Sequence, residues 1–153
     1  DASGAVIGVS GVHTRIHLYW AIIEGINFAL MEGLYSMEKR GKLQVKKLMV
    51  AGGGSQSDEI CQITSDMFGL PVGRTQTHEV SCVGASLVAF VAKGVHPSYE
   101  AAIEAMVHEK DCFMPDMKDH AVYEKLYDQV FIKIFDKLSP LYQVTGEITR
   151  GLQ

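Results

Sequence analysis

A run of three glycines, Gly52–Gly54, is the feature that most restricts how this chain can fold. The residues before it, 46–51, end in a continuous apolar run, which favours a parallel strand buried on both faces. The residues after it place Ile60, Ile63 and Met67 on one helical face. A strand, a glycine turn and a helix in direct succession indicate an α/β fold.

The rest of the chain is rich in predicted helices and poor in strands. Helices are expected over 13–40, 79–93, 98–107 and 119–138, and strands over 4–9 and 70–72, the second only at an edge or end of a sheet. The helix over 79–93 is apolar around most of its circumference and is therefore expected to be buried. Residues 112–115 are expected to be irregular, Pro140 is expected to end the last helix, and 143–153 are expected to form a tail.

Two or three strands make a poor sheet, since three or more are normally needed for independent stability. The chain has 153 residues and begins at Asp1 without an initiator methionine, which predicts that it is an excised piece of a longer protein. Its fold class is expected to be α/β and helix-rich, around a small parallel or mixed sheet.

Composition excludes several classes of partner. The net charge is −4 and no block of Lys or Arg stands out, which argues against nucleic acid and anionic membrane surfaces. No apolar stretch approaches the ~20 residues of a membrane span. The three cysteines form no CxxC pair and are odd in number, which argues against a disulfide scaffold and favours a reducing, cytoplasmic location.

The glycine turn is the strongest candidate for a binding site. Glycines let backbone N–H groups approach a ligand, and the N-terminus of the following helix attracts anions. The candidate residues are Gly52, Gly53, Gly54, Ser55, Gln56 and Ser57. Ser55 with Asp58 resembles a capping box. The turn matches neither the Walker A pattern nor GxGxxG, so a plain β–α turn without a ligand stays open as the alternative.

Other polar residues carry weaker signals. His13 and His17 have the spacing of zinc ligands on a helix, but Thr14 stands where a zincin has Glu and no third ligand is evident, so packing or solvation is favoured. No G-x-S-x-G elbow is present. Glu24 lies beside the apolar stripe at Ile23, and a hydrogen bond to buried backbone is one interpretation of it.

Two stretches together resemble the FGGY family of carbohydrate kinases. The first combines Gly4-x-Val6-x-Gly8-Val9 with His17-Leu18-x-x-Ala21-Ile22-Ile23-Glu24. The second combines the loop 52–57 with Asp66-Met67-Phe68-Gly69-Leu70-Pro71-Val72. Two later segments of the family are also matched. One is Glu79 with Val83-Gly84-Ala85-Ser86, and the other is Pro115 with Val122-Tyr123 and Leu126-Tyr127. The resemblance therefore extends over residues 4–142.

The resemblance implies an actin-like, ribonuclease H-like fold, present here in part. FGGY kinases have two such domains and transfer the γ-phosphoryl group of ATP to a sugar or polyol hydroxyl with Mg²⁺. The C-terminal domain holds most of the ATP contacts. By motif, Gly53 and Ser57 match the nucleotide-contacting glycine and the polar residue four positions on, and Gly52, Gly54, Ser55 and Gln56 line the same turn.

The resemblance also implies what this chain lacks. The catalytic Asp, the metal carboxylate, the sugar pocket and the first phosphate hairpin belong to segments upstream in the family. Residues 1–142 are therefore expected to be the C-terminal, ATP/ADP-binding domain without its first hairpin, with no catalytic residue and no metal ligand, inactive alone. The sugar would bind through the N-terminal domain, with a pentulose (xylulose or ribulose) favoured, and a homodimer is left open.

Two other functions remain as alternatives at this stage. One is a non-catalytic nucleotide-binding module of the actin-like superfamily, used as a sensor or partner domain. The other is an α/β interaction domain without a ligand, whose glycines serve only the turn. The stretch from Gly4 to Glu24 favours the kinase over the non-catalytic module. An ADP titration would separate the interaction domain from the other two.

Overall fold

The computed structural model describes residues 4–151. Along the chain the elements are α1 (Arg15–Gly41), β1 (Leu48–Val50), the 3₁₀ turn η1 (Gly53–Gln56), α2 (Asp58–Phe68), β2 (Val72–Thr75), α3 (Val80–Ala92), α4 (Tyr99–Met106), β3 (Glu109–Phe113), α5 (Met117–Leu126), the π-helical turn η2 (Tyr127–Phe131) and α6 (Ile132–Arg150). None of these helices is both long enough and apolar enough to cross a bilayer. The expected start of the domain at Asp1 and the expected end of the tail at Leu152 and Gln153 lie outside the described residues.

The sheet has the order β1-β2-β3 and is mixed. β1 and β2 are parallel, with Met49 opposite Gly73, and β2 and β3 are antiparallel, with Gly73 opposite Cys112. The prediction of an edge strand around residue 72 is wrong, because β2 is the central strand. The prediction of irregular chain at 112–115 is also wrong in part, since β3 extends to Phe113. β3 pairs through its backbone despite three charged residues, which depress strand propensity.

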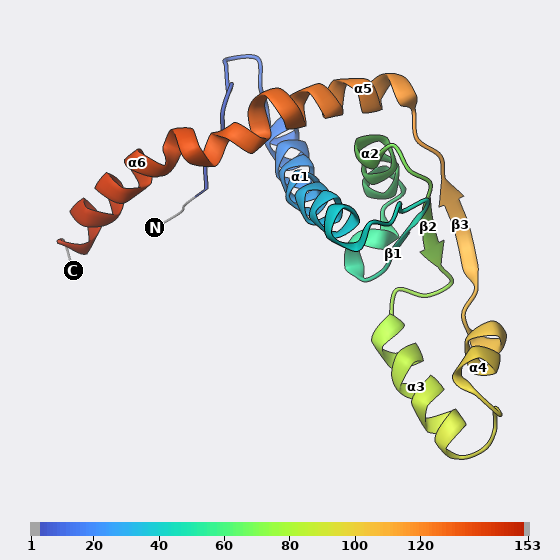
Figure 1. The fold of residues 1–153 in the computed structure, drawn as a ribbon. Coiled ribbons are helices and arrows are strands. Elements are labelled where there is room, and N and C mark those ends of the chain that lie inside the picture. The colour runs from blue at the N-terminus through green and yellow to red at the C-terminus, as the bar shows by residue number, and fades with distance from the viewer. Residues whose placement is uncertain (1–3, 152–153) are drawn as a thin grey trace.

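Helix α2 occupies the centre of the molecule, in contact with α1, with β2 and with α5 (Figure 1). The core forms where these elements meet, from Phe28, Met31, Met67 and Tyr127. Phe131 stacks on Phe28 with 5.2 Å between ring centroids. This cluster fixes α2 against its neighbours, and with it the loop that leads into α2.

The predicted helix over 13–40 is confirmed as α1, which ends where Lys42 adopts the left-handed conformation with φ 47°. The predicted strand over 4–9 is wrong. Those residues are exposed and belong to no ladder among residues 4–151. A strand needs a neighbour to satisfy its N–H and C=O groups, and the described chain supplies none at this place.

The prediction that the helix over 79–93 is buried is also wrong. None of the residues of α3 is buried, and Val88 is 55% exposed. α3 packs against α4, and Figure 1 shows the two helices side by side below the sheet. The apolar sequence therefore lacks a partner on most of its surface within the described chain.

The last helical segment is longer than expected. It begins at Met117, passes through η2 and continues to Arg150 with Pro140 inside α6. The prediction that Pro140 ends the helix is wrong: a proline removes one backbone hydrogen bond, and an exposed helix can lose one bond without breaking. The helix crosses the expected boundary between domain and tail at 142–143, and that division stays a prediction.

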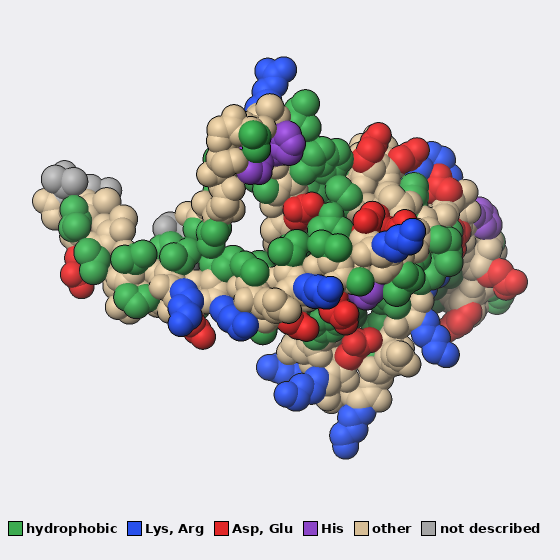
Figure 2. Space-filling view, turned by 90° about the horizontal axis from the view of Figure 1, so that it is seen from above, with side chains coloured by type: hydrophobic (Ala, Val, Ile, Leu, Met, Phe, Trp, Pro, Cys, Tyr) green, Lys and Arg blue, Asp and Glu red, His purple; other side chains and the backbone are tan. Residues whose placement is uncertain are grey.

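Figure 2 shows hydrophobic side chains following one another along the arm formed by α5, η2 and α6. Exposed hydrophobic residues of these three elements include Leu126, Val130, Phe135, Leu141, Val144 and Ile148. The first part of this arm contributes Tyr127 to the core, whereas α6 extends away from the core and none of its residues is buried (Figure 1).

Candidate functional site

The glycine loop lies where β1 ends and α2 begins, at the carboxyl end of a parallel strand. Open α/β sheets bind ligands at such edges. Gly52 has φ 83° and ψ −170°, a conformation open essentially to glycine alone. Gly53 and Gly54 then start the 3₁₀ turn η1, and their N–H groups point out of its first turn without an acceptor inside it.

The space above the three glycines is open. A Cβ atom added to Gly52, Gly53 or Gly54 would meet no atom of the described chain within 4 Å. Backbone conformation requires glycine at Gly52 alone, since Gly53 and Gly54 do not have positive φ. Internal packing thus gives no reason for glycine at 53 and 54, whereas the close approach of another group would.

The two serines of the loop are used within the chain. Ser55 is 4% exposed and its hydroxyl donates to the Gly52 carbonyl at 2.7 Å, which closes the turn. Ser57, not Ser55, caps α2, because its Oγ accepts from the Ile60 N–H at 3.2 Å. The expected capping box of Ser55 with Asp58 is therefore wrong by two positions.

The Ser57 hydroxyl also donates to Glu59 Oε2 at 2.7 Å. This hydrogen bond, together with one from the Glu59 backbone, lowers the pKa of the Glu59 carboxyl. Negative charge is thereby stabilised in the first turn of α2, where the helix dipole also favours it. The first turn of α2 thus already holds its own anionic groups. The N–H groups of Gly53 and Gly54 remain as donors without an acceptor within η1.

Behind the loop lies Arg74 of β2, a residue that the sequence reasoning missed. Its side chain is 9% exposed. The guanidinium makes a bidentate contact with Asp111 of β3, Nε to Oδ1 at 2.8 Å and Nη2 to Oδ2 at 2.6 Å. Nη1 donates to the Ser55 carbonyl at 2.9 Å and lies 2.8 Å from Asp58 Oδ1. A lone arginine inside a short, otherwise uncharged strand was the signal that could have revealed it.

The electrostatics of this cluster follow from its hydrogen bonds. The Arg74 guanidinium lowers the pKa of the Asp111 carboxyl, chiefly through their hydrogen bonds. The same contacts, led by Asp111 and joined by Asp58, raise the pKa of Arg74. The guanidinium also lies over the Phe113 ring, 5.2 Å from its centroid. One permanent cation therefore joins β2, β3, η1 and the start of α2.

The loop separates two hollows of different character. On one side lies a polar cavity of about 250 Å³, lined among others by Gln56, Gln76, His78 and Lys110. On the other side lies an apolar groove of about 350 Å³ between α1, the end of β1 and α2, with Ile23, Leu30, Val50 and Gly54 in its walls. A ligand that combines an apolar ring with polar or anionic groups fits such a place.

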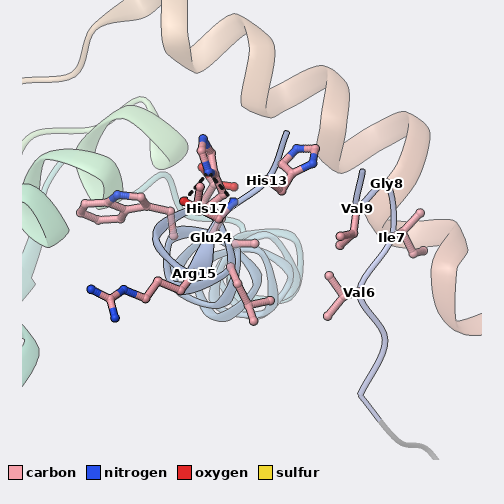
Figure 3. Close-up of a pocket in the computed structure, with 12 residues that line it drawn as sticks. Val6, Ile7, Gly8, Val9, His13, Arg15, His17 and Glu24 are labelled. Atoms are coloured by element: carbon pink, nitrogen blue, oxygen red, sulfur yellow. Dashed lines mark hydrogen bonds between the residues drawn. The ribbon is translucent and has the colours of Figure 1, made fainter. Parts of the chain in front are cut away.

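A further hollow of about 480 Å³ lies between the segment 6–9 and the first turns of α1 (Figure 3). Figure 3 shows Val6, Ile7 and Val9 beside α1, with His13 between the segment and the helix. His17 Nδ1 bonds to Thr14, whose N–H donates at 3.1 Å, and His13 Nδ1 accepts from the Ser10 N–H at 2.9 Å. Residues 4–151 bring together no group of three His, Cys, Asp or Glu that could hold a metal ion.

Glu24 links α1 to α5. Its Oε1 accepts from the Tyr123 hydroxyl at 2.9 Å, so its partner is a side chain and not the buried backbone considered from the sequence. Burial and this contact raise the pKa of Tyr123. The bond holds together two segments that the sequence motifs had singled out separately.

Comparisons with known proteins agree with this geometry. The model of the C-terminal domain of the FGGY family of carbohydrate kinases matches residues 1–93. The chain is 33% identical over 139 residues to a protein named xylulose kinase from Lactococcus lactis, covering 90% of this chain and 28% of that protein. It is 37% identical over 129 residues to the L-xylulose/3-keto-L-gulonate kinase of Escherichia coli, covering 84% and 26%.

A solved structure, the xylulose kinase from Rhodospirillum rubrum, matches with a TM-score of 0.78 and 27% identity, over 93% of this chain and 28% of that one. The predicted fold class, a partial ribonuclease H-like domain with helices around a small sheet, is thereby confirmed. The chain spans little more than a quarter of the length of these relatives.

Proposed function

This chain belongs to the FGGY family of carbohydrate kinases, and we propose that its natural-length protein transfers the γ-phosphoryl group of ATP to a hydroxyl of a sugar or polyol. Residues 52–57 are proposed to hold the nucleotide. The observation that carries this proposal is the open face of the glycine loop, where a Cβ added to Gly53 or Gly54 would meet nothing within 4 Å. The N–H groups of these two residues lie in the first turn of η1, where they have no acceptor within the turn.

The residues of the loop would have different roles in binding the nucleotide. The amides of Gly53 and Gly54 would donate to phosphate oxygens, as backbone N–H groups do in anion sites. Gln56 lines the polar cavity and would contact the nucleotide from that side. Ser55 and Ser57 would act through the shape of the turn, because their hydroxyls already bond to Gly52 and Glu59.

Family kinases use Mg²⁺, which at nucleotide sites is held by one or two carboxylates together with substrate phosphates. Residues 4–151 gather no set of three acidic, His or Cys side chains for a cation. From membership of the family, we propose that the Mg²⁺ ligands, the catalytic base and the sugar pocket lie in parts of the natural protein beyond this chain. Phosphoryl transfer depends on several such parts being positioned together, so this chain alone should have no kinase activity.

For the acceptor we propose a ketopentose, because two of the relatives above are named for xylulose. We also propose a cytoplasmic location, which suits the free thiols of Cys61, Cys82 and Cys112. The ketopentose choice is checked by comparing xylulose, ribulose and glycerol as acceptors for the natural-length protein. A preference for glycerol would overturn this choice without affecting nucleotide binding.

The test of the nucleotide site is the variant Gly53→Ala. Its methyl group would occupy space that a bound nucleotide needs, while meeting nothing in the chain. We expect the dissociation constant of ADP, measured by isothermal titration, to rise at least tenfold without a change in thermal stability. Gly84→Ala in α3 is the matched control, because its added methyl also meets nothing within 4 Å.

The outcomes separate the candidate functions. An ADP affinity that is equal in wild type and Gly53→Ala would remove the glycine loop from the site. Binding of ADP without turnover of any sugar by the natural-length protein would favour the non-catalytic nucleotide module. Sugar-dependent ATP turnover by residues 1–153 alone would contradict the placement of the catalytic parts outside this chain.

A further inference from the structure

The contacts of Arg74 point to more than the stability of the sheet. Replacing a buried ion pair by apolar residues is often neutral or stabilising, so a buried guanidinium is weak evidence for a role in stability. Arg74 also joins parts that the sheet does not need joined: it reaches from β2 to the carbonyl of Ser55 and to Asp58 at the start of α2. Both contacts end on the glycine loop or directly after it.

The first contact sets the direction of the loop amides. In a helical turn the C=O groups point toward one end and the N–H groups toward the other. Arg74 Nη1 holds the Ser55 carbonyl at 2.9 Å, at the C-terminal end of η1. The N–H groups of Gly53 and Gly54 lie at the opposite end of this turn. A Cβ added to either glycine would meet nothing within 4 Å, so the space beside them is open.

The second contact sets the charge beside the loop. Asp58 is the first residue of α2 and its side chain is 72% exposed, so its carboxylate would repel an incoming phosphate. Arg74 Nη1 lies 2.8 Å from Asp58 Oδ1 and offsets that charge. Asp111 in turn fixes the position of the guanidinium by its bidentate contact.

We infer that Arg74 is a positioning residue of the nucleotide site, which orients the glycine loop and partly offsets the negative charge of Asp58 without touching the ligand. This inference rests on the proposed function of the loop. It predicts that altering Arg74 weakens nucleotide binding and leaves sugar binding unchanged, a separation that a merely structural role would not produce.

The test uses the natural-length protein and two variants. Arg74→Lys keeps the charge, but one ammonium group cannot make a bidentate contact with Asp111 and also contact Ser55 and Asp58. We expect the dissociation constant of ADP and the KM for ATP to rise about tenfold, with the KM for the sugar within twofold. Asp111→Asn, at a side chain 36% exposed, leaves Arg74 in place but holds it less firmly, and should raise both nucleotide constants about threefold.

The matched control is Lys47→Met, which removes the other cross-sheet ion pair, between Lys47 and Glu109. That pair does not touch the loop, so nucleotide constants should stay within twofold. The inference is overturned if Arg74→Lys and Asp111→Asn lower the melting temperature but leave the ADP affinity unchanged. It is equally overturned if the sugar and nucleotide constants rise together.

Two further outcomes keep the test decisive. If Arg74→Lys does not fold, Asp111→Asn decides alone, by whether it separates the nucleotide constants from the sugar constant. If the wild-type protein does not bind ADP, the proposed function fails and this inference fails with it. ADP binding that both variants leave intact overturns the role of Arg74 only.

Discussion

Helices α2 and α3 show how little the apolar content of a segment says about its burial. α2 contains charged and polar residues, yet Cys61, Thr64, Ser65, Asp66 and Met67 are all buried. α3 carries no charged residue between Val80 and Ala92, yet none of its residues is buried. The more polar helix lies inside and the more apolar helix lies outside.

The difference lies in the partners. α2 is enclosed by α1, the sheet and α5, and its buried polar groups are satisfied there: Ser65 Oγ donates to the carbonyls of Leu70 and Phe113 at 2.8 and 3.0 Å. α3 packs against α4 and leaves Val88 and Phe90 exposed. An apolar helix favours burial, but burial occurs only where the chain brings another surface to cover it.

The largest expected effect that tests this comparison is a truncation in each helix. Met67 is 0% exposed and touches the core formed with Phe28, Met31 and Tyr127. Met67→Ala should lower the free energy of unfolding by about 3 kcal/mol, because it removes buried contacts and leaves a cavity. Val88→Ala, at a residue that is 55% exposed, should change it by less than about 0.5 kcal/mol.

Both variants are measured by urea unfolding of the 153-residue chain, with wild type alongside. A penalty at Val88 as large as that at Met67 would mean that α3 is covered in solution, by a second copy or by another face of the chain. The contrast between the two helices would then be wrong.

A smaller effect is expected at the glycines that follow the two helices. Gly69 ends α2 with φ 62°, and an added Cβ would lie 2.6 Å from the His120 ring. Gly94 follows α3 with φ 71°, and an added Cβ would meet nothing within 4 Å. A left-handed conformation costs an L-residue about 1–2 kcal/mol by itself.

Gly69→Ala should therefore cost about 2 kcal/mol, since it adds a clash to the backbone strain, and Gly94→Ala about 1 kcal/mol from the strain alone. Melting temperatures and urea midpoints of the two variants measure the difference. The double variant Gly69→Ala with His120→Ala is a control, because removal of the ring should relieve the excess. Equal penalties at both glycines would show that the end of α2 is as loosely packed as the end of α3.

These glycines also show which parts of the fold the sequence could predict. The end of α2 at Gly69, the start of α4 at Ser98 and the strand before the glycine run depend on neighbours along the chain, and they were predicted. The central position of β2 and the strand β3 depend on pairing between segments about 40 residues apart, Gly73 with Cys112 for example. Local periodicity does not contain that information.

The candidate site divides in the same way. Residues 52–57 were found because a glycine run between a strand and a helix is a local pattern. Arg74 was missed because its importance comes from Ser55, Asp58 and Asp111, which only the folded chain brings to one guanidinium. Its position in a short, otherwise uncharged strand could have drawn attention to it, but could not have identified those three partners.

A third test compares the starts of the two helices. Ser57 caps α2 by accepting from the Ile60 N–H, whereas Glu79, at the start of α3, makes no capping hydrogen bond through its side chain. Ser57→Ala should lower the free energy of unfolding by about 1 kcal/mol. Glu79→Ala should leave it within about 0.5 kcal/mol, and urea unfolding of both variants decides. A larger loss at Glu79 would reveal a contact that orders the start of α3.

The smallest effect concerns acid stability at the start of α2. The hydroxyl of Ser57 lowers the pKa of Glu59, so the folded state favours the carboxylate more than the unfolded state does. That contribution is present above the ordinary pKa of a glutamate, about 4.3, and is lost as pH falls through the lowered pKa of the folded state. In Ser57→Ala the pKa of Glu59, followed by NMR titration, should rise toward its ordinary value.

Glu100 at the start of α4 is the control. Its pKa is lowered by its own backbone and by Ser98, and should not change in Ser57→Ala. An unchanged pKa of Glu59 in Ser57→Ala would show that the helix N-terminus alone, without the hydroxyl, sets the acidity there.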